Sequence, residues 1–340
     1  MMNQTYNLKE FHDEVLKWLV NSDIIDDNGV VYSWTNPEKP GYVYMEIIGY
    51  YVKLMSYLYK NTKDQQYLEK AIKSADYLSN NLNENGSVSR YDVEYVFDSA
   101  ICISGMIALS KVKELSENQE KALRKLLDFV YTSLLKKNVA FKDGEPLIDL
   151  DRWSLSYGSL LIKNCMALYE AYEYFDDIKY KDLALNLAKE LIDQCFKEGH
   201  FNINGERNFV YTHPHCYATE GLLFLSSKGI EFDDVVMKAA EWLASNQNED
   251  GSLSSFYYKN VELTKQGDAT SQAVRIWSCV DKEKFIDNIG KGIEFLKTLQ
   301  SDKGGLVYNE GSADVNSWVS IFTLQALYWQ FNQSEKEWLL

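Results

Sequence analysis

Two kinds of helical pattern alternate along this chain. In the first kind, apolar residues recur three and four positions apart and charged residues fill the remaining positions, as in residues 66–80 and 232–245. That spacing is typical of a helix with one buried face. The second kind is apolar on nearly every side, as in residues 98–110 and 316–331, which predicts a fully buried helix. The alternation therefore predicts an outer and an inner layer of helices.

Each kind of pattern occurs six times. We expect outer helices over residues 8–20, 66–80, 118–135, 180–195, 232–245 and 285–299. We expect inner helices over residues 44–59, 98–110, 157–174, 215–225, 269–280 and 316–331. Because six such helical hairpins in a row can close into a double ring, we predict an all-α, single-domain (α/α)6 toroid over residues 1–340.

A short glycine-containing turn recurs at nearly even intervals. Its clearest copies are NQNEDGSLSSF from Asn246, LQSDKGGLVY from Leu299 and LNENGSVSRY from Leu82, and each follows an amphipathic run. With three weaker copies, the turn glycines that we assign are Gly29, Gly86, Gly144, Gly199, Gly251 and Gly305. They lie 57, 58, 55, 52 and 54 residues apart. A fixed period of tens of residues indicates a repeat architecture.

The connections between helices differ in length and chemistry. Links from an inner helix to the next outer helix are short and polar, as in residues 60–65. Links from an outer helix to the following inner helix are longer and carry Tyr, Trp, Asp and Gly, as in residues 251–268. Long connections of mixed chemistry usually carry function, and free backbone N–H groups and positive dipole ends of the inner helices lie at the same end. We therefore expect the mouth of a site there.

Composition narrows the compartment and the partners. The net charge of −15 disfavours a nucleic acid or an anionic membrane as partner, and no apolar run approaches the length of a membrane span. The first residues contain no basic segment followed by an apolar core, so we expect no secretory signal. The five cysteines form no CxxC pair. We therefore expect a cytoplasmic protein with reduced, buried thiols.

The glycine turns also carry a family resemblance. Residues 247–253 (QNEDGSL) and 300–306 (QSDKGGL) resemble the Q-x3-G-x-W repeat of terpene cyclases and prenyltransferase β-subunits, with leucine in place of tryptophan. The DxDD acid motif of the cyclases is absent, and so are recognisable zinc ligands of the protein prenyltransferases. The overall plan is also similar to that of six-hairpin glycosidases, polysaccharide lyases and sugar epimerases. This second resemblance covers the whole chain and implies an enzyme that acts on carbohydrate, although architecture alone does not fix function.

The densest group of candidate catalytic residues opens the fourth inner helix. His213 and His215 are two of only four histidines, and a histidine at the mouth could transfer protons near neutral pH. The alternative is structural, with His213 as a helix cap and His215 bonded to a neighbouring loop. A metal site from these histidines and Cys216 is disfavoured because no nearby carboxylate completes it. We expect no metal.

Four aspartates stand at or just before the starts of inner helices, and each could simply cap its helix. Together they would ring the mouth with carboxylates, and glycoside hydrolysis needs a carboxylic acid and a carboxylate. The candidates are Asp98, Asp151, Asp268 and Asp314. Arg152 could pair with its neighbour Asp151 or clamp a substrate carboxylate or phosphate.

Aromatic residues gather at the same end of the predicted ring. Sugar rings stack their apolar C–H faces on aromatic side chains, although any single ring could instead fill the core. Glu46 joins this set because a carboxylate in an apolar turn must be paired or functional. The residues that we expect to bind substrate are Trp34, Tyr44, Glu46, Tyr95, Arg152, Trp153, Tyr211, Tyr217, Tyr257 and Trp318.

The combination favours a carbohydrate-active enzyme, either a glycoside hydrolase, a lyase or a sugar epimerase, with a small-molecule or oligosaccharide substrate. His213 or His215 and one of the four aspartates would act as acid and base. Two alternatives stay open: an isoprenoid cyclase or transferase, and a non-catalytic toroid that binds a glycan or a protein. The sequence contains no Gly-rich phosphate loop, Rossmann fingerprint, zinc-protease motif or Gly-x-Ser-x-Gly segment. We therefore expect no cofactor.

Overall fold

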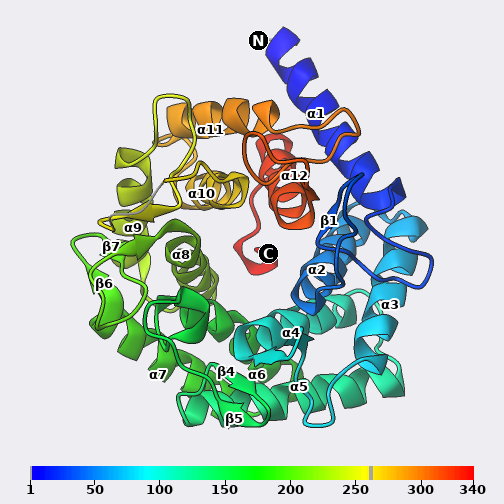
Figure 1. Ribbon diagram of the computed structural model, residues 1–340, viewed down its shortest axis with the longest axis vertical. Coiled ribbons are helices and arrows are strands. Elements are labelled where there is room, and N and C mark those ends of the chain that lie inside the picture. The colour runs from blue at the N-terminus through cyan, green and yellow to red at the C-terminus, as the bar shows by residue number, and fades with distance from the viewer. Residues whose placement is uncertain (1, 260–262) are drawn as a thin grey trace.

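The computed structural model describes residues 2–259 and 263–340, and within these ranges twelve α-helices form two concentric rings (Figure 1). The outer ring consists of α1 (Met2–Asn21), α3 (Gln65–Asn80), α5 (Glu117–Leu135), α7 (Ile178–Cys195), α9 (Asp233–Ser245) and α11 (Ile286–Thr298). The inner ring consists of α2 (Met45–Thr62), α4 (Val96–Ser110), α6 (Asn164–Phe175), α8 (Thr212–Ser227), α10 (Gly267–Val280) and α12 (Ser317–Phe331). This arrangement confirms the predicted (α/α)6 toroid.

The two helical patterns in the sequence correspond to the two rings. The outer helix α3 buries Leu68, Ala71, Ala75 and Leu78 and leaves its other face partly in solvent, whereas every residue of the inner helix α4 before Ser110 is buried. Apolar surface on all sides is stable only between neighbouring helices, so the inner helices occupy the centre. None of the helices within the described ranges is long and apolar enough to cross a membrane.

Glycines allow the inner helices to approach each other closely. A Cβ atom added to Gly105 of α4 would lie 2.4 Å from the carbonyl oxygen of Gly49 in α2. A Cβ added to Gly221 of α8 would lie 2.3 Å from the carbonyl oxygen of Ile162. These distances are below any normal contact, so close helix packing explains both glycines.

The third inner segment differs from its expected form. Instead of one helix over residues 157–174, a 3-10 segment η2 (Ser159–Lys163) precedes α6, and a shorter one, η1 (Trp153–Leu155), lies in the connection before it. Tighter 3-10 turns are common at the N-terminal ends of α-helices. The split displaces the start of α6 away from the mouth and leaves η1 there in its place.

The recurring turn is confirmed, with one correction. Its glycines have left-handed backbone angles, with φ between +81° and +100°, which other residues rarely adopt. The sixth of them is Gly304 (φ +100°), so the assignment of Gly305 is wrong by one residue. Gly305 is small for another reason, because a Cβ there would lie 2.4 Å from the Trp18 ring.

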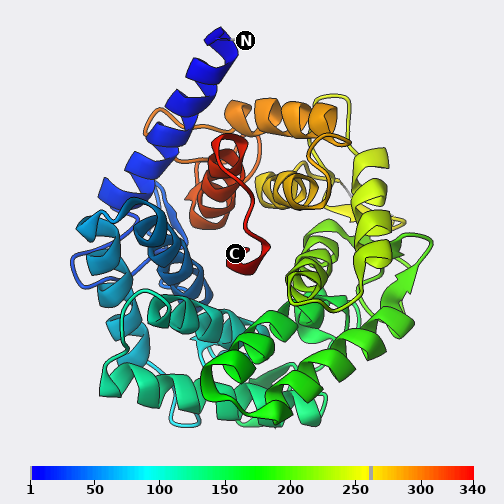
Figure 2. The same ribbon diagram turned by 180° about the vertical axis from the view of Figure 1, so that it is seen from behind.

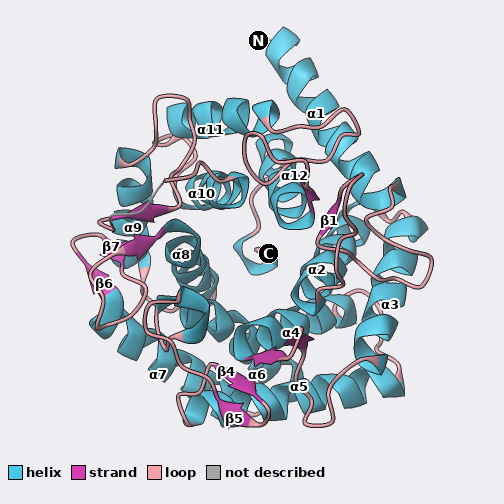
Figure 3. Cartoon of the chain, viewed as in Figure 1, coloured by secondary structure: helices cyan, strands magenta, loops and turns pink. Residues whose placement is uncertain are grey.

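Short strands join the long connections at the mouth end of the ring (Figure 3). β2 (Ser89–Arg90), β3 (Val93–Tyr95), β4 (Ala140–Lys142) and β5 (Glu145–Pro146) form one antiparallel sheet in that order. The remaining strands pair in twos, β6 (Phe196–Lys197) with β7 (His200–Phe201), and β8 (Val210–Tyr211) with β9 (Phe256–Tyr257). The pair of β1 (Trp34–Thr35) and β10 (Val315–Asn316) aligns Trp34 with Asn316 and links the first connection to the last.

The C-terminal segment lies on the ring axis, as both faces of the ring show (Figures 1 and 2). It contains the 3-10 helix η3 (Lys336–Trp338), and Leu339 and Leu340 are buried. Trp338 packs on Tyr57 near the C-terminal end of α2, with ring centroids 5.5 Å apart. The segment therefore fills the end of the ring opposite to the mouth.

Candidate active site

A cavity of about 680 Å³ opens where the inner helices begin, a size typical of a small-molecule site. The residues that we expected at a site and that line this cavity are Trp34, Tyr44, Glu46, Tyr95, Asp98, Asp151, Arg152, Trp153, Tyr211, His213, Asp268, Asp314 and Trp318. They come from connections and helix starts in every part of the ring. Three further candidates, His215, Tyr217 and Tyr257, lie outside the lining.

His215 is committed to holding the outer wall together. Its Nδ1 accepts a hydrogen bond from the backbone N–H of Phe201 at 3.1 Å, and its Nε2 lies 3.3 Å from the carbonyl oxygen of Ala239. Burial lowers the pKa of His215 to about 3, so the ring is neutral and donates from Nε2. This is the structural alternative considered for His215 in the sequence, and it leaves neither nitrogen for a substrate.

Tyr217 and Tyr257 also have internal partners. Tyr257 donates its hydroxyl to the carbonyl oxygen of Asn246 at 2.9 Å and packs on Trp242, with ring centroids 5.0 Å apart. Tyr217 is fully buried one turn beyond His213 on α8. Its ring centroid lies 4.2 Å from that of His213, and its hydroxyl lies 3.5 Å from Oε1 of Glu46. Tyr217 therefore lies beneath the cavity and connects the wall formed by α8 to the wall formed by α2.

Two carboxyl groups occupy the first turns of α2 and α4. Glu46 accepts a hydrogen bond at Oε2 from Nε1 of Trp318 at 3.2 Å. Burial raises the pKa of Glu46 well above its usual range, and the negative charge of Asp98 raises it further. Oδ2 of Asp98 is buried without a hydrogen-bond partner among the described residues. An unpaired buried carboxylate oxygen is costly, so this position favours the protonated form.

The pKa of Asp98 lies in the range useful for catalysis. Burial raises it from 3.8 to about 7, against the opposing effects of a hydrogen bond with Tyr44 and the positive charge of Arg90. Asp98 is only 4% exposed although it lines the cavity. A buried acid with a pKa near 7 can hold a proton at neutral pH and donate it in a reaction.

His213 lies in the first turn of α8, and α8 faces α2 across the ring (Figure 1). Its Nδ1 is 2.5 Å from Oε1 of Gln272 and 3.6 Å from Oδ2 of Asp268, both on α10. Burial lowers the pKa of His213, against the opposing effect of the charge of Asp268. His213 is therefore neutral near pH 7 and can accept a proton.

The two other aspartates belong to the rim of the cavity. Asp151 forms an ion pair with Arg207 at 2.8 Å, and its side chain is 66% exposed. The Arg207 hydrogen bond lowers the pKa of Asp151. Asp314 forms an ion pair with Lys39 at 3.0 Å and accepts a hydrogen bond from Asn36 at 2.6 Å. The ring of four carboxylates expected from the sequence thus divides into two paired rim residues and two buried residues.

Aromatic side chains form much of the wall between these groups. Tyr44 and Trp318 contact each other with ring centroids 5.1 Å apart. Trp153 lies 5.7 Å from His213 and 5.6 Å from Tyr211 by the same measure. Trp153 is the residue that η1 places at the mouth, so the irregular third segment contributes directly to the wall.

Sequence reasoning missed several lining residues, namely Arg90, Phe97, Ser154, Leu160, Phe256, Lys259, Tyr308, Asn309, Ser312 and Asn316. Arg90 is the most informative of them. Its guanidinium lies over the rings of Tyr44 and Tyr95, and Nη2 donates to the Tyr95 hydroxyl at 3.2 Å. Arg90 and Tyr308 each follow a turn glycine by four residues, Gly86 and Gly304. The other four turns place Ser33, Ile148, Ile203 and Ser255 at the same offset, outside the lining, so the repeat alone did not single out Arg90 and Tyr308.

The described residues include no group of three or more His, Cys, Asp or Glu side chains placed to hold a metal ion. All five cysteines are free and buried. Burial raises the pKa of the thiol of Cys216 well above its usual range, and the charge of Glu220 adds to this effect.

The fold of this chain is similar to that of several solved structures. A sugar epimerase from a ruminal bacterium matches with a TM-score of 0.74 and 15% identity, over 98% of this chain and 99% of that one. Cellobiose 2-epimerase from Bacillus thermoamylovorans matches with a TM-score of 0.72 and 14% identity, over 96% and 100%. An unsaturated glucuronyl hydrolase from Streptococcus agalactiae matches with a TM-score of 0.72 and 14% identity, over 97% of this chain and 93% of that one. No protein-family model and no curated protein matches the sequence. At these identities, the likeness establishes the (α/α)6 toroid fold.

Proposed function

We propose that this chain is a carbohydrate-active enzyme in which Asp98 donates a proton and His213 accepts one. The observation that carries the proposal is the pair of opposite protonation states in one cavity. Asp98 has its pKa raised to about 7, whereas burial lowers the pKa of His213. Near neutral pH the site therefore holds an acid and a base that are both ready for proton transfer.

The lining supports a sugar as the substrate. Aromatic faces such as Trp153 and Trp318 suit the C–H faces of a sugar ring, and the polar groups among them suit its hydroxyls. An aromatic chain leads outward from the cavity, because Tyr42 contacts Trp34 at 5.0 Å and Tyr91 at 5.4 Å between ring centroids. Tyr91 is 78% exposed, so a substrate with more than one sugar unit would find aromatic surface beyond the cavity.

The acid and the base define a reaction class. In hydrolysis or elimination, Asp98 would protonate the glycosidic oxygen that leaves. His213 would remove a proton from the attacking water or from a carbon of the sugar. In epimerisation, the same two groups would remove and return a proton at one carbon. Asp151 and Asp314 are ion-paired at the rim and would contact the outer part of a substrate.

The test is a substrate screen on the purified protein. The panel contains cellobiose, an unsaturated glucuronyl disaccharide and a polysaccharide, because the similar structures include a cellobiose 2-epimerase, an unsaturated glucuronyl hydrolase and a polysaccharide lyase. Proton NMR of the sugar signals detects hydrolysis, elimination and epimerisation in one experiment. We expect turnover that is lost in Asp98→Asn and in His213→Gln and retained in Asp234→Asn, a change on the exposed face of α9 and outside the cavity lining.

Other outcomes would assign a different function. Thermal stabilisation by saccharides without turnover would indicate a glycan-binding toroid, since a ligand that binds only the native state raises the melting temperature. Stabilisation only by an isoprenoid diphosphate with Mg²⁺ would replace the carbohydrate proposal by the isoprenoid alternative. Turnover that persists in both Asp98→Asn and His213→Gln would show that other residues perform the chemistry.

A further inference from the structure

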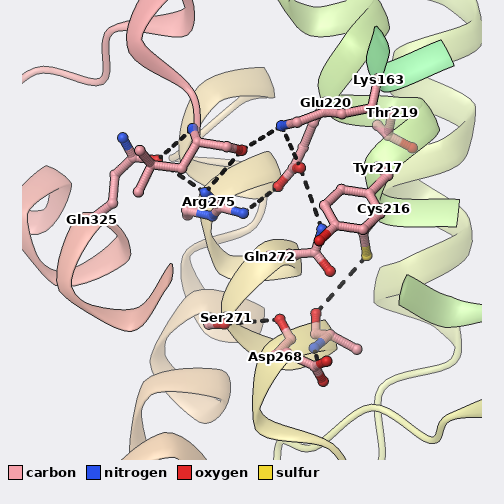
Figure 4. Close-up of polar contacts among 12 residues, drawn as sticks. Lys163, Cys216, Tyr217, Thr219, Glu220, Asp268, Ser271, Gln272, Arg275 and Gln325 are labelled. Carbon is pink, nitrogen blue, oxygen red and sulfur yellow. Dashed lines mark hydrogen bonds and ion pairs between the residues drawn. The ribbon is translucent and has the colours of Figure 1, made fainter. Parts of the chain in front are cut away.

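A buried glutamine on α10 connects His213 to a buried cluster of charges. Gln272 is fully buried, and its Oε1 lies 2.5 Å from Nδ1 of His213. At the other end of the same amide, Nε2 lies 3.3 Å from Oε2 of Glu220 (Figure 4). Gln272 is one turn beyond Asp268 on the same helix. The amide therefore lies between the cavity and the interior of the inner ring.

The charge cluster fixes Glu220. Arg275 donates from Nη2 to Oε1 of Glu220 at 2.6 Å, and Lys163 donates from Nζ to Oε2 at 2.9 Å. All three residues are buried. Lys163 also donates to the backbone carbonyl oxygen of Leu340, and Arg275 contacts the side chain of Gln325 at 3.1 Å. Figure 4 shows the side chains of Lys163, Arg275 and Gln272 converging on the carboxylate of Glu220.

This arrangement determines which way the amide of Gln272 faces. A carboxylate paired with two cations has acceptor oxygens only, so the group of Gln272 that faces Glu220 must be its NH₂. The amide oxygen then faces His213, and because this oxygen can only accept, Nδ1 of His213 must carry the hydrogen. The second neighbour of Nδ1, Oδ2 of Asp268 at 3.6 Å, is also an acceptor. Both neighbours favour the same tautomer.

We propose that Gln272 is a positioning residue that holds His213 in the neutral tautomer with its hydrogen on Nδ1. In this tautomer the lone pair is on Nε2, for which no hydrogen-bond partner occurs among the described residues, and His213 lines the cavity. The charge cluster acts on the site through Gln272, because Glu220 orients the amide and the amide orients the imidazole. That Nε2 then serves as a base rests on the proposed function; the tautomer itself does not.

Histidine tautomers can be measured directly without a substrate. Long-range proton–nitrogen correlation spectra of ¹⁵N-labelled protein distinguish a protonated from an unprotonated ring nitrogen, and the sequence has only four histidines. Loss of a signal set in His213→Gln assigns that set to His213. In the wild type we expect a protonated Nδ1 and an unprotonated Nε2 at neutral pH. The reverse assignment would overturn the proposal.

Two variants separate Gln272 from Asp268. Gln272→Met keeps the length of the side chain and removes the acceptor, so we expect the His213 nitrogen shifts to move toward a mixture of tautomers. Unchanged shifts would mean that Asp268 sets the tautomer alone, which would overturn the role of Gln272. Gln330→Met, on α12, is the matched control and should leave the His213 signals in place.

A conservative variant keeps the proposal testable if Gln272→Met does not fold. Gln272→Glu keeps an acceptor oxygen toward His213, and its second oxygen, which faces the Glu220 carboxylate, holds a proton in place of the amide hydrogen. Nδ1 of His213 should therefore keep its hydrogen. The other charged or titratable groups that face His213 are Asp268, Glu220, Arg275 and Tyr217, and none of them is substituted in this variant. A hydrogen on Nε2 in place of Nδ1 would contradict the predicted contact.

Once a substrate is known, Gln272→Met should lower kcat more than it raises KM, because the amide acts on the base and does not line the cavity. A fall in kcat/KM that comes from a higher KM with kcat unchanged would contradict a positioning role. If no sugar is turned over but the tautomer follows Gln272, the proposed function fails and this inference stands. If sugars are turned over but the His213 tautomer does not change in Gln272→Met, the proposed function stands and this inference fails.

Discussion

Replacement of Asp98 by asparagine should make the protein more stable at neutral pH, and by a growing amount as the pH rises. The raised pKa of Asp98 is the reason. Its native value is about 7 and its ordinary value is 3.8. Between these values the native state binds a proton that the unfolded state has released, so the free energy of unfolding falls as the pH rises. The contribution of Asp98 to stability is fully present below pH 3.8 and is lost as the pH rises through about 7.

The size of the effect follows from the shift. One pKa unit corresponds to about 1.36 kcal/mol, and the shift spans about 3 units, so the wild type loses about 4 kcal/mol through this one group. Asparagine has nearly the same shape and no charge at any pH. The difference in unfolding free energy, variant minus wild type, should therefore increase by about 4 kcal/mol between about pH 4 and about pH 8.

Urea denaturation followed by tryptophan fluorescence, repeated across this pH range, measures that difference. Far-UV circular dichroism recorded on the same samples must give coincident curves before a two-state free energy is taken. Asp151→Asn is the matched control, because Asp151 is exposed and its ion pair with Arg207 lowers its pKa. The Asp151→Asn variant should show no gain in unfolding free energy over the wild type at high pH.

A difference for Asp98→Asn that does not change with pH would refute this reasoning. It would mean that Asp98 is ionised throughout the range, and the residue would then lose its assignment as the proton donor. Part of the measured gain will come from Glu46, whose pKa is also raised and falls when the charge at position 98 is removed. The double variant with Glu46→Gln separates the two contributions.

Three further outcomes follow from the packing. Glu220→Gln leaves Lys163 and Arg275 buried without their carboxylate and should cost about 3–5 kcal/mol in urea denaturation; a cost below about 1 kcal/mol would show that the cluster relaxes freely. Gly304→Ala should destabilise the protein more than Gly311→Ala. Both glycines have a left-handed backbone, but a Cβ added at Gly304 would lie 2.6 Å from a backbone carbonyl oxygen in α1, whereas a Cβ added at Gly311 would meet nothing. Equal melting temperatures of the two variants would contradict this. All five thiols should resist a thiol reagent until the protein unfolds, and a rapidly reacting cysteine in the native protein would show that its helix opens.

The fold was predictable because its signals are local. Helix period, glycine turns and connection lengths each depend on a few neighbouring residues. Together they predicted six hairpins whose helix boundaries agree with the observed ones within about three residues, except that α1 begins earlier and α6 later than expected. The one shifted turn, at Gly304, arose because two glycines stand side by side and only backbone angles separate them. The 3-10 start of the third inner segment carries no distinct pattern in the sequence.

The sequence predicted in which region of the fold the site lies, but not which side chains face each other there. His213 and His215 are two residues apart on one helix, so their side chains point about 200° apart, and only one can face the axis. The sequence did not show which. Glu46 lies near Asp98, and His213 contacts Gln272, because the inner helices of successive hairpins pack side by side. The contact of Glu46 with Trp318 additionally needs closure of the ring. The pKa of Asp98 likewise depends on burial that no local pattern encodes.

The pairing of Trp34 with Asn316 has a consequence for how the protein is made. Trp318 and Glu46, which share a hydrogen bond, are 272 residues apart in the chain, so a ribosome must deliver nearly every hairpin before that wall of the cavity exists. Until then the inner helices present apolar surface to water at the open end of an incomplete arc. Contacts of such long range slow folding, and exposed apolar edges invite aggregation. The closing step therefore exposes this ring, during synthesis, to misassembly that a linear stack of the same hairpins would avoid.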